Sequence, residues 1–131
     1  MTTEQIQLLL QTKGYIPTID EDGDLLFKAQ GRRLYASVSD TDPDYMRFFL
    51  DLLINTGDAT KLDVFEAANS AERHFKCVKC MILRHDDEGI RLRVAVECFT
   101  SIETLARNIE RCIDIICATT WHITRTLQSD D

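Results

Sequence analysis

Apolar and polar residues alternate in several short runs of the sequence, and this period of two predicts β-strands. In the clearest run, apolar side chains take every second position: Ile90, Leu92, Val94, Val96 and Cys98. Segments 25–29 and 34–38 show the same alternation and are predicted to be half-buried strands. A further short strand is predicted at 15–19, either at a sheet edge or irregular, because Pro17 cannot donate a ladder hydrogen bond.

Two acidic turns connect strand-like runs and predict β-hairpins. Asp20-Glu21-Asp22-Gly23-Asp24 follows the strand predicted to end at Ile19. His85-Asp86-Asp87-Glu88-Gly89 separates a strand predicted at 77–83 from the run that begins at Ile90. Turn-forming residues between two strand patterns are the usual sequence signal of a hairpin, whose strands pair antiparallel.

Two segments carry the 3.6-residue period of amphipathic helices. The first is 3–13, with Thr3 as its predicted N-cap and Gly14 just after its end. The second runs from Asp58, its predicted N-cap, to about His74. Its inward face is expected to carry Val64, Phe65, Ala68, Ala71 and Phe75.

A third helix is predicted from Thr100 to about Gln128, opening with a capping box formed by Thr100 and Glu103. About 27 residues give a length of ~40 Å at 1.5 Å per residue, so this helix is expected to cross the whole sheet. Its apolar stripe consists of Ile102, Leu105, Ile109, Cys112, Ile113, Ile116 and Ile123.

Segment 44–54 fits both periods. As a helix, it presents one apolar face made of Tyr45, Phe48, Phe49, Leu52 and Leu53. As a strand, it divides into one face of Met46, Phe48, Leu50, Leu52 and Ile54 and another of Tyr45, Arg47, Phe49, Asp51 and Leu53. Periodicity alone slightly favours the helix.

The order of elements predicts an α+β fold, with an antiparallel sheet backed by N-terminal, central and long C-terminal helices (α-β-β-β-β-α-β-β-α). At 131 residues, the range 1–131 is expected to be one domain.

Acidic residues outnumber basic residues by 22 to 15, for a net charge of −7. This charge argues against a nucleic-acid partner, because phosphate binding needs clustered Lys and Arg.

No apolar run approaches the ~20 residues of a membrane span, so no membrane association is expected. The start Met1-Thr2-Thr3-Glu4 lacks the basic and apolar regions of a secretory signal. Five cysteines without a regular framework suit free thiols in a reducing cytoplasm.

The candidate chemistry of the chain is sparse. Cys77-Val78-Lys79-Cys80 matches C-x-x-C, but no second ligand pair accompanies it, so no metal is expected. The favoured interpretation is that these cysteines act as small hydrophobic residues in the sheet. A thiol enzyme using Cys77 or Cys80 is the least favoured interpretation. Without a nucleophile motif or a phosphate-binding glycine loop, the chain is expected to be non-enzymatic and to need no cofactor.

Several motifs occur in a characteristic order. The first half contains Gly14-Tyr15, Asp20-Glu21-Asp22-Gly23-Asp24, Gly31-Arg32-Arg33 and Asp40-Thr41-Asp42-Pro43-Asp44-Tyr45. The second half contains Glu66-Ala67-Ala68-Asn69 and Phe75-Lys76-Cys77-Val78-Lys79. Across nearly the whole chain, this order resembles the YbjN-type family, which is labelled as a family of bacterial sensory transduction regulators. The family often has a second Asn where this chain has Glu72.

The resemblance implies a YbjN-like domain with an α+β fold similar to the type III secretion chaperones, and it favours a strand at 44–54. Proteins of that architecture commonly bind other protein segments and are often dimeric. The family has no established catalytic residues, so the resemblance supplies none.

We therefore expect a cytoplasmic protein-binding module, chaperone- or adaptor-like and regulatory, that receives a partner segment at a sheet edge or across an apolar groove. The expected partner-binding residues are Arg91, Arg93, Tyr45, Phe49 and Trp121. Alternation places both arginines on one sheet face. That face is either a docking strip for an acidic segment or an ordinary solvated face with cross-strand ion pairs.

Two alternatives concern the last helix. Trp121, Ile123 and Leu127 either cover the sheet or the first helix, or form a homodimer contact. The alternative function is small-molecule sensing in a pocket between the sheet and this helix. Its expected lining is Phe27, Tyr35 and Phe99.

Overall fold

The computed structural model describes residues 1–128, and within them three helices and six strands follow one another in the predicted order. The elements are α1 (Thr3–Thr12), β1 (Thr18–Ile19), β2 (Leu25–Ala29), β3 (Arg32–Val38), β4 (Tyr45–Ile54), α2 (Lys61–His74), β5 (Val78–Asp86), β6 (Gly89–Phe99) and α3 (Ile102–Gln128). The predicted α+β class is confirmed.

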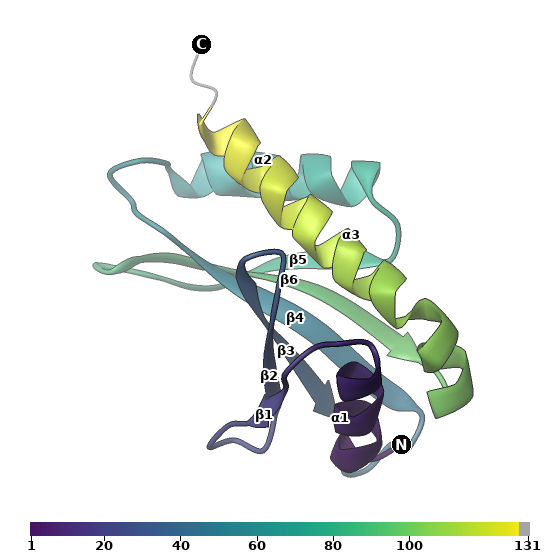
Figure 1. Cartoon of the computed structure of the whole chain (residues 1–131). Coiled ribbons are helices and arrows are strands. Elements are labelled where there is room, and N and C mark those ends of the chain that lie inside the picture. Colours follow the sequence, from purple (N-terminus) through teal and green to yellow (C-terminus); the bar gives the residue numbers. More distant parts are fainter. Residues whose placement is uncertain (129–131) are drawn as a thin grey trace.

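The strands form a single antiparallel sheet in the order β1-β2-β3-β4-β6-β5. All three helices pack on one face of this sheet, and α3 runs diagonally across it from α1 to α2 (Figure 1). The opposite face carries no helix within the described residues, and we call it the open face. The fold therefore has two layers.

Segment 45–54 is a strand, as the family resemblance predicts. It pairs with β3 on one side and, over its full length, with β6 on the other. Met46, Phe48 and Leu50 are buried under the helices, so the period of two decides the structure of this segment. The segment is not a helix, because its backbone pairs with β3 on one side and β6 on the other and its aromatic residues lie on both faces of the sheet.

The first predicted strand is shorter than expected. Only Thr18 and Ile19 pair with β2. The Tyr15 N–H instead donates to the Leu10 carbonyl at 3.0 Å, where it closes the end of α1, and Pro17 has no N–H to donate. Pairing therefore begins only after Pro17.

The predicted N-caps of the first two helices are wrong by one or two residues. Thr2, not Thr3, caps α1, and Thr60, not Asp58, caps α2. Both form a full capping box with the residue three positions later, which satisfies two backbone N–H groups at once. At both helices, the residue that serves as N-cap is the one whose backbone N–H is bonded in return by the side chain three positions later.

The predicted N-cap of α3 is also displaced by one residue. The Ser101 hydroxyl, rather than that of Thr100, accepts a hydrogen bond from the Thr104 N–H at 3.2 Å. Thr104 therefore takes the third position that the prediction gave to Glu103. The helix still begins and ends where its sequence pattern indicates.

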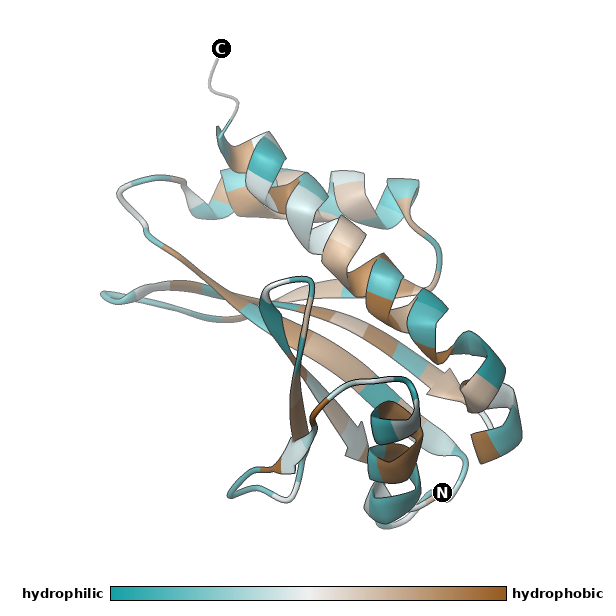
Figure 2. Ribbon diagram, viewed as in Figure 1, coloured by the Kyte–Doolittle hydropathy of each residue, from teal (hydrophilic) through white to brown (hydrophobic). Residues whose placement is uncertain are grey.

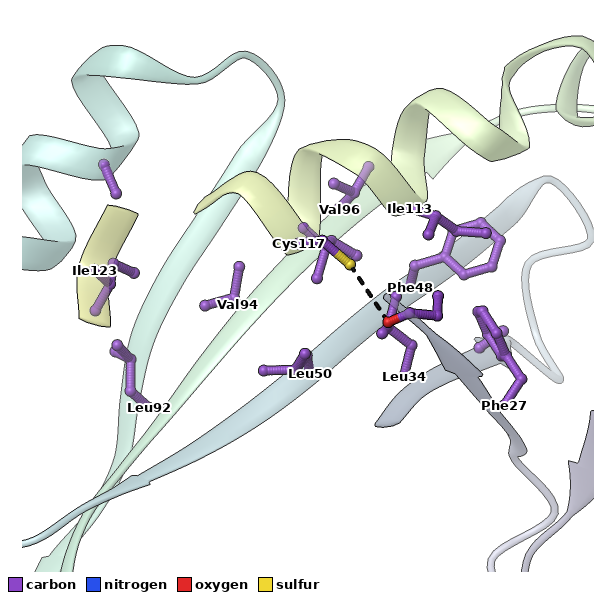
Figure 3. Packing of buried hydrophobic residues seen from close by; sticks show 14 of the residues in the cluster. Phe27, Leu34, Phe48, Leu50, Leu92, Val94, Val96, Ile113, Cys117 and Ile123 are labelled. Carbon is purple, nitrogen blue, oxygen red and sulfur yellow. Dashed lines mark hydrogen bonds between the residues drawn. The ribbon is translucent and has the colours of Figure 1, made fainter. Parts of the chain in front are cut away.

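The core lies between the helix layer and the sheet. Apolar residues follow the central strands and alternate with hydrophilic residues around α3 (Figure 2). Ile113 and Cys117 of α3 lie over sheet residues such as Phe48, Leu50 and Val96, and the Cys117 thiol donates to the Ala29 carbonyl at 3.9 Å (Figure 3). The prediction for α2 needs one correction, because Phe65 is exposed and Ala67 is buried in its place.

Candidate functional site

The open face combines aromatic and charged side chains from five strands. Antiparallel register places residues that pair across strands on the same face. One row across the sheet is Leu26, Tyr35, Phe49, Ala95 and Lys79. The strands place seven cations on this face, Lys28, Arg33, Arg47, Lys79, Arg84, Arg91 and Arg93, and three carboxylates, Asp51, Asp86 and Glu97. Two carboxylates of the adjoining turns add to these, because Asp24 interacts electrostatically with Arg93 and Arg47, and Glu88 pairs with Arg84. The open face is thus rich in cations although the whole chain is acidic.

Asp51 holds two arginines at the centre of the open face. The Arg93 side chain donates from Nε to Asp51 Oδ1 at 2.7 Å and from Nη2 to Oδ2 at 2.9 Å. Arg91 donates to the same Oδ2 from Nε at 3.0 Å and from Nη2 at 2.6 Å. Burial raises the pKa of Asp51, but the hydrogen bonds from the two guanidinium groups outweigh it and hold that pKa below its usual value.

Neighbouring side chains cover the Phe49 ring. The Tyr35 ring stacks on it, with centroids 5.1 Å apart and an interplanar angle of 11°. The guanidinium carbons of Arg93 and Arg47 lie 4.1 and 4.8 Å from its centroid. Phe49 is therefore only 5% exposed although it points away from the helices. Cation–π and stacking contacts hold the two arginines in fixed positions.

A second ion-pair group lies beyond Phe49 toward the beginning of β4. Glu97 lies 3.4 Å from Lys79 and 4.0 Å from Arg47. Beyond it, Tyr45 and Phe99 meet edge to face at 6.0 Å, and Phe99 is 77% exposed. The face thus ends in an exposed aromatic ring beside a charged network.

The structure brings together four of the five residues predicted to bind a partner. Tyr45, Phe49, Arg91 and Arg93 share the open face. Trp121 lies elsewhere, on α3, where Arg125 stacks over its ring at 5.0 Å. Ile123 is fully buried and Leu127 packs against the core, so these two cover the sheet layer while Trp121 is 58% exposed.

The pocket predicted from Phe27, Tyr35 and Phe99 does not exist as one site. Phe27 is 2% exposed and belongs to the core. Tyr35 lies on the open face, at the row of Phe49. Phe99 lies at the far end of β6, opposite Tyr45. The sequence pattern identified three aromatic strand positions but not the faces and strand ends that separate them.

The cysteines are unpaired, and burial disfavours the thiolates of Cys80, Cys98, Cys112 and Cys117. Burial, aided by the negative charge of Glu72, raises the pKa of Cys80 to about 12. Burial also raises the pKa of Cys112 to about 11. Because the thiolate is the nucleophile, these two groups are poorly suited to thiol chemistry at neutral pH. Cys77 is exposed and precedes β5 with a positive φ of 62°.

A histidine cluster joins α2 to α3, and the sequence analysis missed it. Ser70 Oγ lies 3.1 Å from His122 Nε2, and the His74 and His122 rings stack with centroids 5.3 Å apart. Ser–His pairing is one part of a hydrolase triad, but the other ring neighbours of His122 are His74 and Phe75, not a carboxylate that orients a general base. The 52-residue separation of Ser70 and His122 leaves no local signal.

The described part of the chain contains neither a cluster of metal ligands nor a membrane-spanning helix. Among residues 1–128, no three His, Cys, Asp or Glu side chains are gathered so as to hold a metal ion. In the same range, no helix combines the length and apolar character that crossing a membrane requires.

Both edges of the sheet are protected against strand addition. At one edge, β1 has only two residues. At the other, β5 carries an irregularity between Ile82 and Arg84, and the outward Cys80 N–H donates to Glu72 Oε1 of α2 at 2.8 Å. Short strands, bulges and blocked donors are the usual ways to prevent edge pairing. Docking on a face is therefore better supported than addition at an edge.

Replacing Glu72 with alanine is expected to expose the Cys80 N–H. Hydrogen exchange at that amide should become about 2- to 13-fold faster, since the hydrogen bond contributes roughly 0.5–1.5 kcal/mol. Exchange measured by NMR tests this, with Glu66→Ala as the control from an exposed position of the same helix. Unchanged protection of Cys80 contradicts the assigned role of Glu72.

The fold and the open face define an α+β protein in which a one-sided helix layer leaves a cation-rich sheet face uncovered. No protein-family model matches the chain, and no curated protein sequence matches it. Its fold is shared by solved structures, among them one from E. coli and one from Methanothermobacter thermautotrophicus.

The crystal structure of YbjN, a proposed transcription regulator from E. coli, superposes with a TM-score of 0.74 at 12% identity, covering 91% of this chain and 88% of that one. An uncharacterised protein from Methanothermobacter thermautotrophicus superposes with a TM-score of 0.64 at 14% identity, covering 97% of this chain and 99% of the other. At these identities the likeness shows a shared fold and leaves function to be argued from the site.

Proposed function

We propose that this chain is a non-enzymatic, adaptor- or chaperone-like module that docks an acidic segment of a partner protein on its open face. The carrying observation is the charge of that face, where seven cations outnumber five carboxylates when Asp24 and Glu88 of the adjoining turns are included. In the whole chain, by contrast, acidic residues outnumber basic ones by 22 to 15. A local field opposite in sign to the net charge orients an acidic partner toward one surface.

The arrangement of the face favours protein over nucleic acid. Asp51 and Glu97 stand among the arginines, where they repel a continuous phosphate backbone but match the mixed charges of a protein segment. Phe49 is covered by its neighbours and does not offer a free ring for base stacking. The exposed Phe99 ring supplies an apolar anchor at one end. The five unpaired cysteines suit a reducing cytoplasm.

A matched pair of charge reversals tests this proposal. Lys28→Glu/Arg33→Glu inverts two exposed cations of the open face that take no part in the Asp51 network. Arg107→Glu/Arg111→Glu makes the same charge change on exposed positions of α3. Each protein is used for affinity capture from the native cell, with nuclease treatment and a carbodiimide, which couples the amines of Lys28 and Lys79 in the wild type directly to partner carboxylates.

The expected result is a nuclease-resistant partner that cross-links through acidic segments near Lys79. Its capture should fall at least fivefold in the open-face variant and stay unchanged in the α3 variant. Retention of the partner by the open-face variant contradicts the proposal. Loss of the captured material on nuclease treatment assigns the face to nucleic acid instead.

A further inference from the structure

A groove on the helix side of the molecule is separate from the open face. It has a volume of about 780 Å³ and lies where the β2–β3 turn, the end of α2 and the middle of α3 meet. Its lining is Gln30, Arg32, His74, Phe75, Asp114, Cys117, Ala118, Trp121 and His122. This volume falls within the range of small-molecule sites in proteins.

The walls of the groove are held in place by contacts between its three elements. Gln30 Nε2 donates to Asp114 Oδ1 at 2.9 Å, which joins the β2–β3 turn to α3. Gln30 has a φ of +53°, a conformation rare for a residue with a side chain, and this bond helps to fix it. Ser70 fixes the His122 ring from α2. The lining is therefore pre-organised, which lowers the ordering cost of binding.

The groove offers flat rings as well as charge. His74 stacks on His122 at an angle of 13°, and Phe75 meets both rings edge to face. Trp121 lies at the rim, 58% exposed. These rings provide surfaces for a planar aromatic ligand.

The charges of the groove select the sign of the ligand. One oxygen of Asp114 is engaged by Gln30, whereas Arg32 forms no ion pair within 4.0 Å among the described residues. A free guanidinium beside aromatic rings is suited to a carboxylate attached to a flat ring.

We propose that this groove binds a small planar aromatic anion, with the ring against Trp121 and the histidine pair and the anionic group at Arg32. This site is independent of the protein-docking function of the open face. It gives the small-molecule alternative a different location from the one expected from the sequence.

Trp121 is the only tryptophan of the chain, so its fluorescence reports on this groove. The probe is 4-nitrobenzoate, a planar aromatic anion and an efficient quencher, and the matched neutral probe is 4-nitrobenzamide. Saturable quenching of Trp121 by the benzoate at pH 7.5 is expected, with an affinity at least fivefold weaker for the amide. Arg32→Gln should weaken benzoate binding at least fivefold, and His74→Ala should weaken both probes.

Two controls make the outcome decisive. Arg107→Gln removes an exposed α3 cation outside the groove, and the open-face variant Lys28→Glu/Arg33→Glu leaves the groove lining intact; both should bind like the wild type. Circular dichroism verifies that each variant is folded. Quenching that rises linearly without saturation, equal affinity for the two probes, or full affinity in Arg32→Gln overturns the proposal.

Discussion

Replacing Gly89 with alanine is expected to destabilise the protein by about 3–5 kcal/mol. Gly89 begins β6 at a φ of +133°, a region that costs an L-residue roughly 1–3 kcal/mol. A Cβ at this position would lie 2.5 Å from the Ile54 carbonyl oxygen and 3.5 Å from Leu53 Cδ1. The oxygen belongs to the backbone at the end of β4, so it cannot rotate away as a side chain does.

The loss is large because it falls on the longest strand pair. Relief of the contact requires β4 and β6 to separate near the Ile54–Ile90 pair, and β4 and β6 form the centre of the sheet. A loss of this size is a large share of the ~5–15 kcal/mol that stabilises a typical domain. The β5–β6 hairpin therefore depends on glycine for space as well as for conformation.

Urea unfolding of Gly89→Ala and Gly14→Ala separates these two causes. Gly14 also has a positive φ, of +96°, but a Cβ there meets no atom within 4 Å. Gly14→Ala is expected to cost only the conformational part, about 1–2 kcal/mol. Equal losses in the two variants contradict the assigned steric contact with Ile54.

The sequence reveals the strands through short-range alternation, and it reveals little about which strands are neighbours. The alternation within residues 90–98 identifies their buried face without reference to any other segment, and these residues lie in β6. Segment 45–54 does not, because its apolar residues fit a helical period slightly better than the strand period. Its structure is decided by pairing with β3 and β6, and both are contacts outside the segment.

The candidate site shows the same limit. Alternation alone places Arg91 and Arg93 on one face, yet their partner Asp51 is about forty residues away and comes into register only through the β4–β6 pairing. The cross-strand ion pairs expected as the alternative reading of this face are present. The excess of cations that motivates a docking role is present beside them.

Trp121 shows how an approximate period misleads. It follows Ile113 and Cys117 at steps of four, and each such step turns about 40° beyond a full helical turn. After two steps, the side chain points about 80° away from the buried stripe. Ile113 is fully buried, whereas Trp121 is exposed and lines the helix-side groove.

Replacing Asp51 with asparagine is expected to destabilise the fold by about 2–3 kcal/mol at neutral pH. The carboxylate accepts four hydrogen bonds from two guanidinium groups, and the Arg93 side chain is only 17% exposed. Asparagine keeps the shape of the side chain but removes its charge and one acceptor oxygen. The positive charge of Arg93 then loses its partner at a position that water solvates poorly. The matched control is Asp86→Asn, whose partner Arg84 is 41% exposed; it should cost less than about 1 kcal/mol.

The pH dependence of stability gives a second test of Asp51. Its native pKa is held below the usual value, so the unfolded chain binds this proton more readily than the folded one. The stabilisation from Asp51 is complete above the unfolded pKa of about 3.9 and is lost as the pH falls through the lower native pKa. Unfolding free energies at pH 7 and near pH 3 should therefore show a wider gap between wild type and Asp51→Asn at the higher pH. A gap that stays constant over this range, or a loss equal to that of Asp86→Asn, contradicts the role of Asp51 as the ionic centre of the open face.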